Sequence, residues 1–128
     1  MEIPGPLFRR RLLIESLIVL AADSGPQVSW LVAHGVMPDE IALDFDHAFG
    51  MAEALVADGQ LTRDVLPDLR EIDEVLSSMS GAEHAGRWTT GALDTDEGWA
   101  LARGLARRVL VAELGEWQHP LPEIVVIR

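Results

Sequence analysis

The sequence contains no cysteine, lysine, tyrosine or asparagine among its 128 residues. The absence of cysteine excludes disulfides, thiolate zinc sites and cysteine nucleophiles, and it is compatible with either redox compartment. Every basic residue other than histidine is arginine, a bias that a GC-rich genome also produces. Long apolar runs are missing too. Glu15 and Ser16 interrupt the run that follows the arginines at 9–11, which argues against a signal peptide and a membrane span. We therefore expect a cytoplasmic protein.

Positive charge is scarce, with 10 arginines against 21 acidic residues and a net charge of −11. The acidic excess is concentrated between residues 39 and 74, where 11 acids and 2 arginines give a net charge of −9. Such a field repels nucleic-acid phosphates and anionic membranes, and it favours basic proteins or cations. We expect neither nucleic acid nor a membrane as a partner. The alternative is that the acidity only keeps a small protein dissolved.

With 48% hydrophobic and 24% charged residues, the composition is that of a folded globule. A chain of this length buries roughly two thirds of its unfolded surface without metal or disulfide support. The apolar periodicity predicts an all-α fold, a single compact domain of about five helices over residues 1–116. Residues 117–128 are predicted to form an extended tail, because Pro120 and Pro122 force an open path. The IVVI segment of this tail has β character, and the tail packs on the domain or on a partner.

Glycine, proline and capping residues divide the helical part. The predicted helices cover residues 6–22, 24–35, 38–59, about 67–79, and 95–114. The VSWLV segment in the second of these also fits a strand. Residues 82–94 are predicted to be a loop with one turn of helix, pinned to the core by Trp88.

The predicted core collects the apolar stripes of these helices. Its members are Leu13, Leu17, Trp30, Ile41, Phe45, Phe49, Leu69, Ile72, Leu76, Trp99, Leu105 and Val109. We expect the indole nitrogen of Trp30 to find a carbonyl or a water. Arg103 and Arg107 are expected to remain outside the core, with Trp99 and Arg103 one turn apart for a cation–π contact.

The segment 38–59 is the longest with an unambiguous helical period, and its carboxylates lie in two flanks beside one apolar face. A narrow strip of mostly small residues lies opposite that face, and such a strip lets another backbone come close. It is therefore a candidate homodimer interface, with the terminal IVVI segment as the alternative. The strip consists of Leu43, Gly50, Ala54 and Ala57.

One candidate metal site lies on the same segment, where Glu40, Asp44 and His47 are about one turn apart on a shared flank. A carboxylate and a histidine at this spacing reach one ion in helical di-metal bundles. Those bundles need a second such pair on a regular facing helix. Here the second pair, Glu116 and His119, falls in an irregular segment, which favours a solvated acidic flank instead.

Other catalytic motifs are not present. No serine lies in a Gly-x-Ser-x-Gly turn, and the glycines lack the lysine and the strand-turn-helix context of a phosphate loop. An aromatic pocket for a small molecule, lined by Trp30, Trp88 and Trp99, is an alternative to their role as core residues. We expect no cofactor.

These patterns favour a non-enzymatic, acidic protein-binding module that neutralises a basic protein, as an inhibitor or immunity factor does. A metal-dependent helical enzyme or carrier and a small-molecule binder are the alternatives. The carboxylates expected to contact the partner are Asp39, Asp46, Glu53, Asp68 and Glu71. In charge and size alone, the chain resembles small acidic bacterial proteins that neutralise a basic partner, such as toxin immunity proteins.

Overall fold

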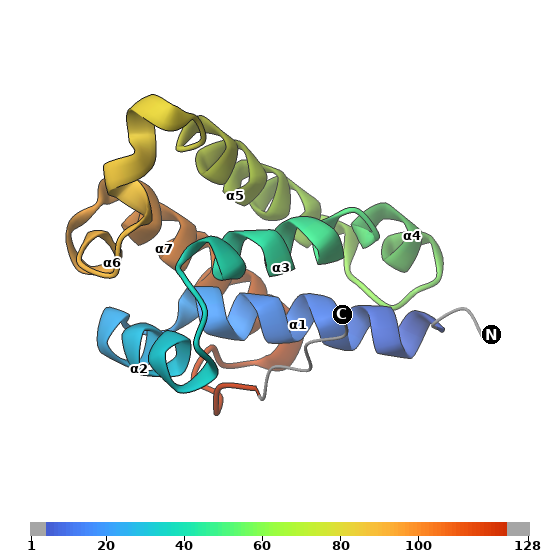
Figure 1. Cartoon of the computed structure of the whole chain (residues 1–128). Helices are drawn as coiled ribbons and strands as arrows, with labels where there is room; N and C mark the ends of the chain where they lie inside the picture. Colours follow the sequence, from blue (N-terminus) through green and yellow to red (C-terminus); the bar gives the residue numbers. More distant parts are fainter. Residues whose placement is uncertain (1–4, 123–128) are drawn as a thin grey trace.

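Helices form all the regular structure of residues 5–122, the part of the chain that this computed structural model describes (Figure 1). In chain order they are α1 (Pro6–Ala21), α2 (Ser24–His34), α3 (Asp39–Phe49), α4 (Ala52–Ala57), η1 (Arg63–Val65), α5 (Leu66–Ser78), η2 (Ala82–Trp88), α6 (Ala92–Thr95) and α7 (Glu97–Leu114), with η1 and η2 of the 3₁₀ type. The all-α prediction is confirmed. The helices outnumber the predicted five, because short helical turns form in segments predicted as connections. The IVVI segment, residues 124–127, lies outside the described residues.

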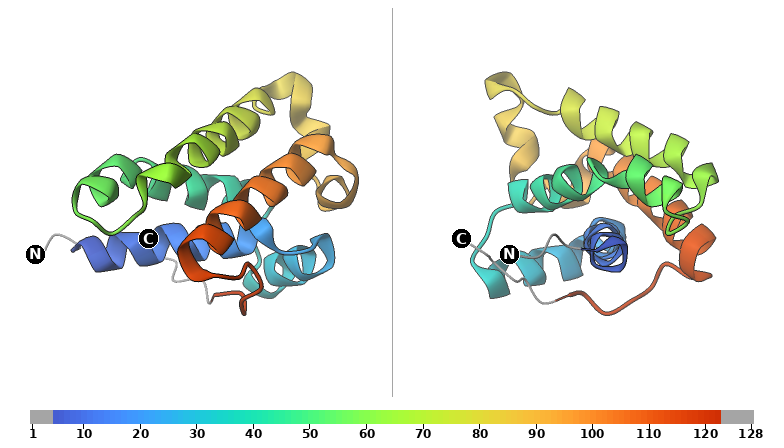
Figure 2. Two further views of the ribbon diagram at one scale, coloured as in Figure 1. Left: turned by 180° about the vertical axis from the view of Figure 1, so that it is seen from behind. Right: turned by 90° about the vertical axis from the view of Figure 1, so that its right-hand side faces the viewer.

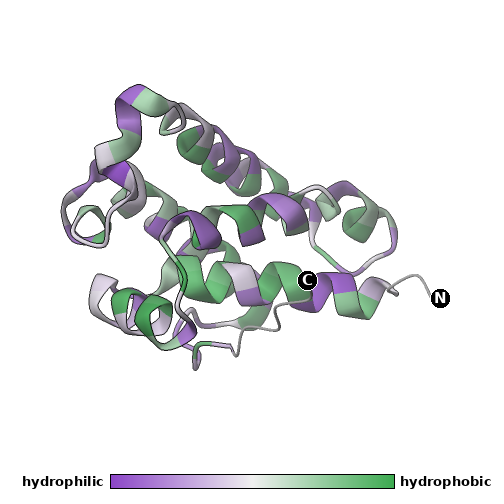
Figure 3. Cartoon of the chain, viewed as in Figure 1, coloured by the Kyte–Doolittle hydropathy of each residue, from purple (hydrophilic) through white to green (hydrophobic). Residues whose placement is uncertain are grey.

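Four helices surround the core as a ring. α1 packs against α3 and α7, and α5 packs against the same two helices from the opposite side. The views in Figures 1 and 2 agree on this arrangement, with α1 and α5 on opposite sides of α3 and α7. α2 and α6 contact each other at one end, and α4 lies against α1 at the other. Figure 3 shows apolar and polar residues following each other along α3 and α5, as amphipathic helices require.

The predicted core is confirmed in eleven of its twelve residues, which are all buried. The exception, Phe49, is partly buried and stacks on Phe45 with 5.6 Å between ring centroids. Phe49 is the last residue of α3. The apolar stripe of Val65, Leu69, Ile72, Leu76 and Met79 is buried along its whole length.

The single helix predicted over residues 38–59 is wrong, since it is broken between α3 and α4. The amide of Met51 donates to the carbonyl of Ala48 (3.1 Å), which tightens the last turn, and Met51 itself has φ −103° and ψ 0°. The chain resumes as α4 in a new direction, and Ala52 and Leu55 are buried in the core beside α1. A periodicity count could not detect this break, because apolar residues continue on both sides of it.

Side chains of α2 and α7 donate hydrogen bonds to the carbonyls at the end of α1. Gln27, which is fully buried, donates from Nε2 to the carbonyls of Val19 (3.0 Å) and Leu20 (3.1 Å). Two arginines of α7 serve the next two carbonyls. Nε of Arg107 donates to Ala21 and Nε of Arg103 donates to Ala22, both at 2.9 Å. We refer to these three donor side chains and their acceptors as the α1 carbonyl cluster.

The prediction that Arg103 and Arg107 remain outside is therefore wrong, and both guanidinium groups are partly buried at this junction. Nη2 of Arg103 also donates to Oε1 of Gln27 (3.0 Å) and to the carbonyl of Leu93 (2.8 Å). The cation–π partner is different from the predicted one. Arg107, and not Arg103, lies over a tryptophan, with its guanidinium carbon 3.7 Å from the ring centroid of Trp117.

The segment after α7 runs back along the domain without regular structure. Gly115 ends α7 in a left-handed conformation, as Gly35 ends α2, so both predicted helix stops are confirmed. The indole nitrogen of Trp30 donates to the carbonyl of Pro122 at 2.7 Å, which confirms the expectation of a carbonyl partner. The VSWLV segment around Trp30 is helical, so the strand alternative is wrong. No helix in the described ranges has the length and apolar character needed to cross a membrane.

Candidate functional site

A surface groove with a volume of about 700 Å³ lies between α3, α5 and η2. α3 contributes Leu43 and the carboxylates of Asp39 and Asp46, while α5 contributes Asp73 and Leu76. η2 contributes Trp88, and the loop before α3 contributes Met37. The groove therefore combines an apolar lining with acidic side chains from two helices.

The helical period of α3 places its apolar residues on two faces, one toward the core and one toward the solvent. Phe45 faces inward and is 0% exposed, whereas Leu43 is 60% exposed. Met37, just before the helix, is 67% exposed. Large apolar side chains with such exposure at the edge of a groove are typical of binding surfaces. On α5, Leu76 is buried beneath the groove and Asp73, one turn earlier, is half-buried.

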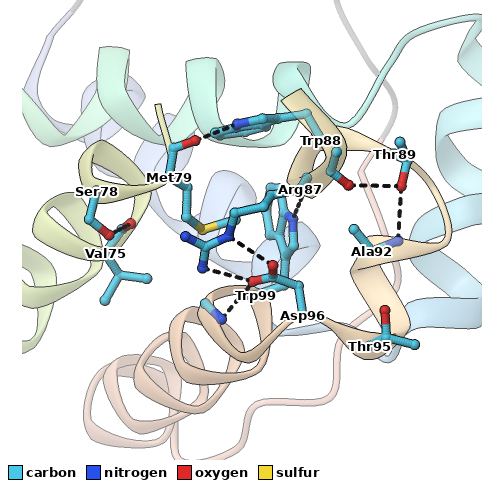
Figure 4. Close-up of polar contacts among 12 residues, drawn as sticks. Val75, Ser78, Met79, Arg87, Trp88, Thr89, Ala92, Thr95, Asp96 and Trp99 are labelled. Carbon is cyan, nitrogen blue, oxygen red and sulfur yellow. Dashed lines mark hydrogen bonds and ion pairs between the residues drawn. The ribbon is translucent and has the colours of Figure 1, made fainter. Parts of the chain in front are cut away.

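The third wall, η2, is held by polar contacts that Figure 4 shows. The guanidinium of Arg87 binds the carboxylate of Asp96 through two hydrogen bonds of 2.8 and 3.1 Å. The indole nitrogen of Trp88 donates to the carbonyl of Met79 (2.8 Å), and that of Trp99 donates to the carbonyl of Arg87 (2.7 Å). The rings of Trp88 and Trp99 pack edge to face, with 5.3 Å between their centroids. The prediction that Trp88 pins this segment to the core is confirmed.

Asp96 is also the N-cap of α7. Its carboxylate accepts hydrogen bonds from the amides of Gly98 (2.7 Å) and Trp99 (3.4 Å). The hydrogen bonds from Arg87, followed by those from the two amides, hold the pKa of Asp96 below its ordinary value against the effect of burial. One carboxylate thus fixes the start of α7 and the third wall of the groove together.

Two carboxylates of the groove, Asp46 and Asp73, repel each other. Burial, followed by the negative charges of Asp46 and Glu74, raises the pKa of Asp73 above its ordinary value. Asp46 and Asp73 lie on different helices, so packing of α3 against α5 brings the two charges to one surface. In residues 5–122 no ion pair involves Asp39, Asp46 or Asp73. A cation placed in the groove would relieve this repulsion.

Two of the five carboxylates predicted to contact a partner, Asp39 and Asp46, line the groove. Two others lie elsewhere and pair within the chain: Glu53 with Arg70 at 3.1 Å and Asp68 with Arg108 at 3.4 Å. The fifth, Glu71, is exposed on α5 outside the groove. The structure thus brings together only part of the predicted acidic set, and the partner contacts themselves stay a prediction.

The candidate metal ligands Glu40, Asp44 and His47 do share one flank of α3, but they interact with each other instead of converging on a vacant centre. Partial burial of its carboxyl, the charge of Glu40 and a hydrogen bond with Glu40 raise the pKa of Asp44 to about 6, with His47 opposing the shift. Within residues 5–122 no group of three histidine, aspartate or glutamate side chains is placed to hold a metal ion. The predicted second pair is in irregular chain, where the His119 ring bonds the carbonyl of Glu116.

The three tryptophans proposed for an aromatic pocket do not line one cavity. Trp88 lines the groove, and Trp99 packs behind it with 1% of its surface exposed. Trp30 contacts His34 and the carbonyl of Pro122 and is not part of the groove lining.

The candidate dimer strip is divided by the break after α3. Leu43 lies on α3, Gly50 lies at the break, and Ala54 and Ala57 lie on α4. All four residues are exposed. The strip is therefore not one continuous helical face, and the homodimer stays a prediction.

Sequence reasoning missed Asp73 and Leu76 as groove residues. The apolar periodicity predicts Leu76 as a core residue only, and no sequence pattern marks Asp73. The only sequence feature that indicates their proximity is their spacing of three residues, which places both at the edge of the buried stripe of α5. The contact of α5 with α3, which makes them part of a groove, depends on tertiary structure.

The groove offers binding chemistry, since its lining joins apolar contacts to fixed negative charge. The chain has no match among protein-family models, curated proteins or solved structures. Its function is therefore inferred from this groove.

Proposed function

We propose that the protein is a non-enzymatic binding module, located in the cytoplasm, whose groove receives a basic segment of another protein. One observation carries the proposal: exposed apolar side chains lie beside three aspartates that have no basic partner among the described residues. A segment that supplies both an apolar anchor and a cation satisfies both features.

The charge of the whole chain supports the same partner. A net charge of −11 accelerates encounter with a basic protein and disfavours anionic ones. Some carboxylates outside the groove pair with arginines of the chain. These pairs contribute less to the negative electrostatic field close to the surface than unpaired carboxylates do. Neutralisation of a basic partner, of the inhibitor or immunity type, is consistent with such a surface.

Binding of a fluorescein-labelled peptide composed of leucine and lysine, followed by fluorescence anisotropy, tests the proposal. Removal of two groove charges in the double variant Asp46→Asn/Asp73→Asn is expected to weaken binding about tenfold or more, because charge-assisted contacts are lost. The control Asp64→Asn/Glu71→Gln removes the same charge from exposed positions outside the groove. It is expected to change the affinity by less than about twofold at physiological salt.

The two double variants separate a groove from a diffuse acidic surface. Equal losses of affinity in both would show that the peptide responds only to net charge, and the proposal would then fail. Thermal melting checks the fold of each variant. Asp46→Asn/Asp73→Asn is expected to melt at the same temperature as the wild type or higher, because it removes a repulsion.

A further inference from the structure

The groove has the shape and chemistry of a receptor for one kind of secondary structure. Resting on the proposed function, we propose that its occupant is an amphipathic α-helix with an apolar stripe and basic residues beside that stripe. Proteins recognise peptide segments chiefly by adding a strand to a sheet edge, by holding a polyproline helix on aromatic residues, or by seating a helix in an apolar groove.

The first two modes lack their usual receptor surface here. Residues 5–122 contain no strand, so this part of the chain offers no sheet edge for strand addition. Two aromatic residues line the groove, and one of them, Phe45, is 0% exposed. Trp88 is thus the one aromatic ring of this lining that reaches solvent, whereas polyproline grooves use several.

The lining fits the third mode. Helices α3 and α5 form two walls, and η2 forms the third. Small residues, among them Ala42, Gly81 and Ala85, line the groove and leave room for the backbone of a helix to approach. Met37 and Leu43 extend into solvent at its edge, where apolar residues spaced by three or four positions would meet them.

The charges determine which helix fits. Asp39 and Asp46 lie on α3 and Asp73 lies on α5, so basic residues on the flanks of the apolar stripe would face them. A second copy of this chain is a poor occupant, because it carries a net charge of −11 itself.

The experiment compares two labelled leucine–lysine peptides of about 18 residues that differ only at two central positions. One has leucine at helical spacing, and the other has the same sequence with two central residues replaced by proline. The helical peptide is expected to bind about tenfold more tightly or better, because proline breaks the helix. Circular dichroism is expected to show a gain of helix when the peptide binds.

A second pair of variants locates the apolar contacts. Met37→Ser/Leu43→Ser is expected to weaken binding of the helical peptide about tenfold. The control Val32→Ser changes a residue of α2 that is 73% exposed and lies outside the groove. Equal losses in the two variants would overturn the inference.

The outcomes distinguish this inference from the proposed function. If both peptides bind equally and both are weakened by Asp46→Asn/Asp73→Asn, the occupant is a basic segment without helical structure. The inference then fails and the proposed function stands. If neither peptide depends on these aspartates, both fail. Light scattering gives a further outcome. If the protein dimerises, and does so more strongly in Asp46→Asn/Asp73→Asn, the occupant is a second copy of the chain. The inference and the proposed function would then both be overturned.

Discussion

Arg103 forms three hydrogen bonds at 2.8–3.0 Å, two of them to main-chain carbonyls, and so completes the α1 carbonyl cluster with Gln27 and Arg107. Carbonyls at the end of a helix have no partner within the helix, and cationic donors stabilise them well. The sequence pattern placed these arginines in solvent because arginine is rarely buried without partners. Their partners at the end of α1 and on Gln27 lie more than 70 residues away, and local periodicity does not detect such contacts.

Substitution of Arg103 by methionine should destabilise the fold. Arg103→Met preserves much of the side-chain volume but leaves two carbonyls without this donor, so the free energy of unfolding is expected to fall by about 2–4 kcal/mol. Urea denaturation followed by circular dichroism measures this change. The control is Arg108→Met on the same helix, where a side chain 72% exposed pairs with Asp68. Its expected cost is below about 1 kcal/mol, and equal costs for both variants would contradict the role of the cluster.

Asp44 makes stability depend on pH. Its pKa of about 6 lies above the ordinary 3.8, so the folded protein binds this proton more tightly than the unfolded chain does. The resulting stabilisation is complete below pH 3.8 and is lost as the pH rises through 6. Asp44→Asn should therefore stabilise the protein at pH 7 by about 1 kcal/mol, after allowance for solvent screening, and should have little effect at pH 3.5.

Denaturant titrations of Asp44→Asn at several pH values check this prediction. The same substitution at exposed Asp64 is the control. A gain that is identical at pH 3.5 and pH 7 would indicate that the proton on Asp44 is not its cause.

At the scale of elements, the turns between helices determine the direction of each helix, which the helical period does not predict. α3 and α4 share one apolar pattern but differ in direction, and the turn at Gly50 and Met51 sets that difference. Gly50 has φ −57° and ψ −18°, which any residue adopts. Gly81, in the groove lining before η2, has φ +113°, where other residues are strained. The backbone conformation therefore requires glycine at position 81 but not at position 50.

Alanine substitutions should separate these two glycines. At Gly50 an added Cβ would lie 3.5 Å from the carbonyl oxygen of His47, an ordinary contact, so Gly50→Ala should be neutral or stabilising by up to about 1 kcal/mol. At Gly81 the Cβ would lie 2.9 Å from Oε2 of Glu83 in a strained backbone, so Gly81→Ala should cost about 1–3 kcal/mol. Thermal melting of the two variants compares them directly. A stabilised Gly81→Ala would show that the backbone there relaxes freely.

For the molecule as a whole, the sequence was sufficient for the fold class and most of the core but not for the candidate site. Single-sided stripes such as Leu69, Ile72 and Leu76 determine which face of a helix is buried, and this is a local property. The groove needs Asp46 of α3 beside Asp73 of α5 and a wall held by Arg87 and Asp96, and these are tertiary contacts. Charge counting found the acidic region, but it could not separate carboxylates that pair within the chain from those that do not.

The α1 carbonyl cluster also constrains the order of events during synthesis. α1 leaves the ribosome before α7, and Arg103 and Arg107 follow the carbonyls to which they donate by 81 and 86 residues. A nascent chain that has not reached α7 lacks these donors and one of the helices that pack against α1. Contacts between distant parts of a chain form late because closing a long loop costs entropy. We therefore expect the domain to reach its final structure only after translation has passed α7.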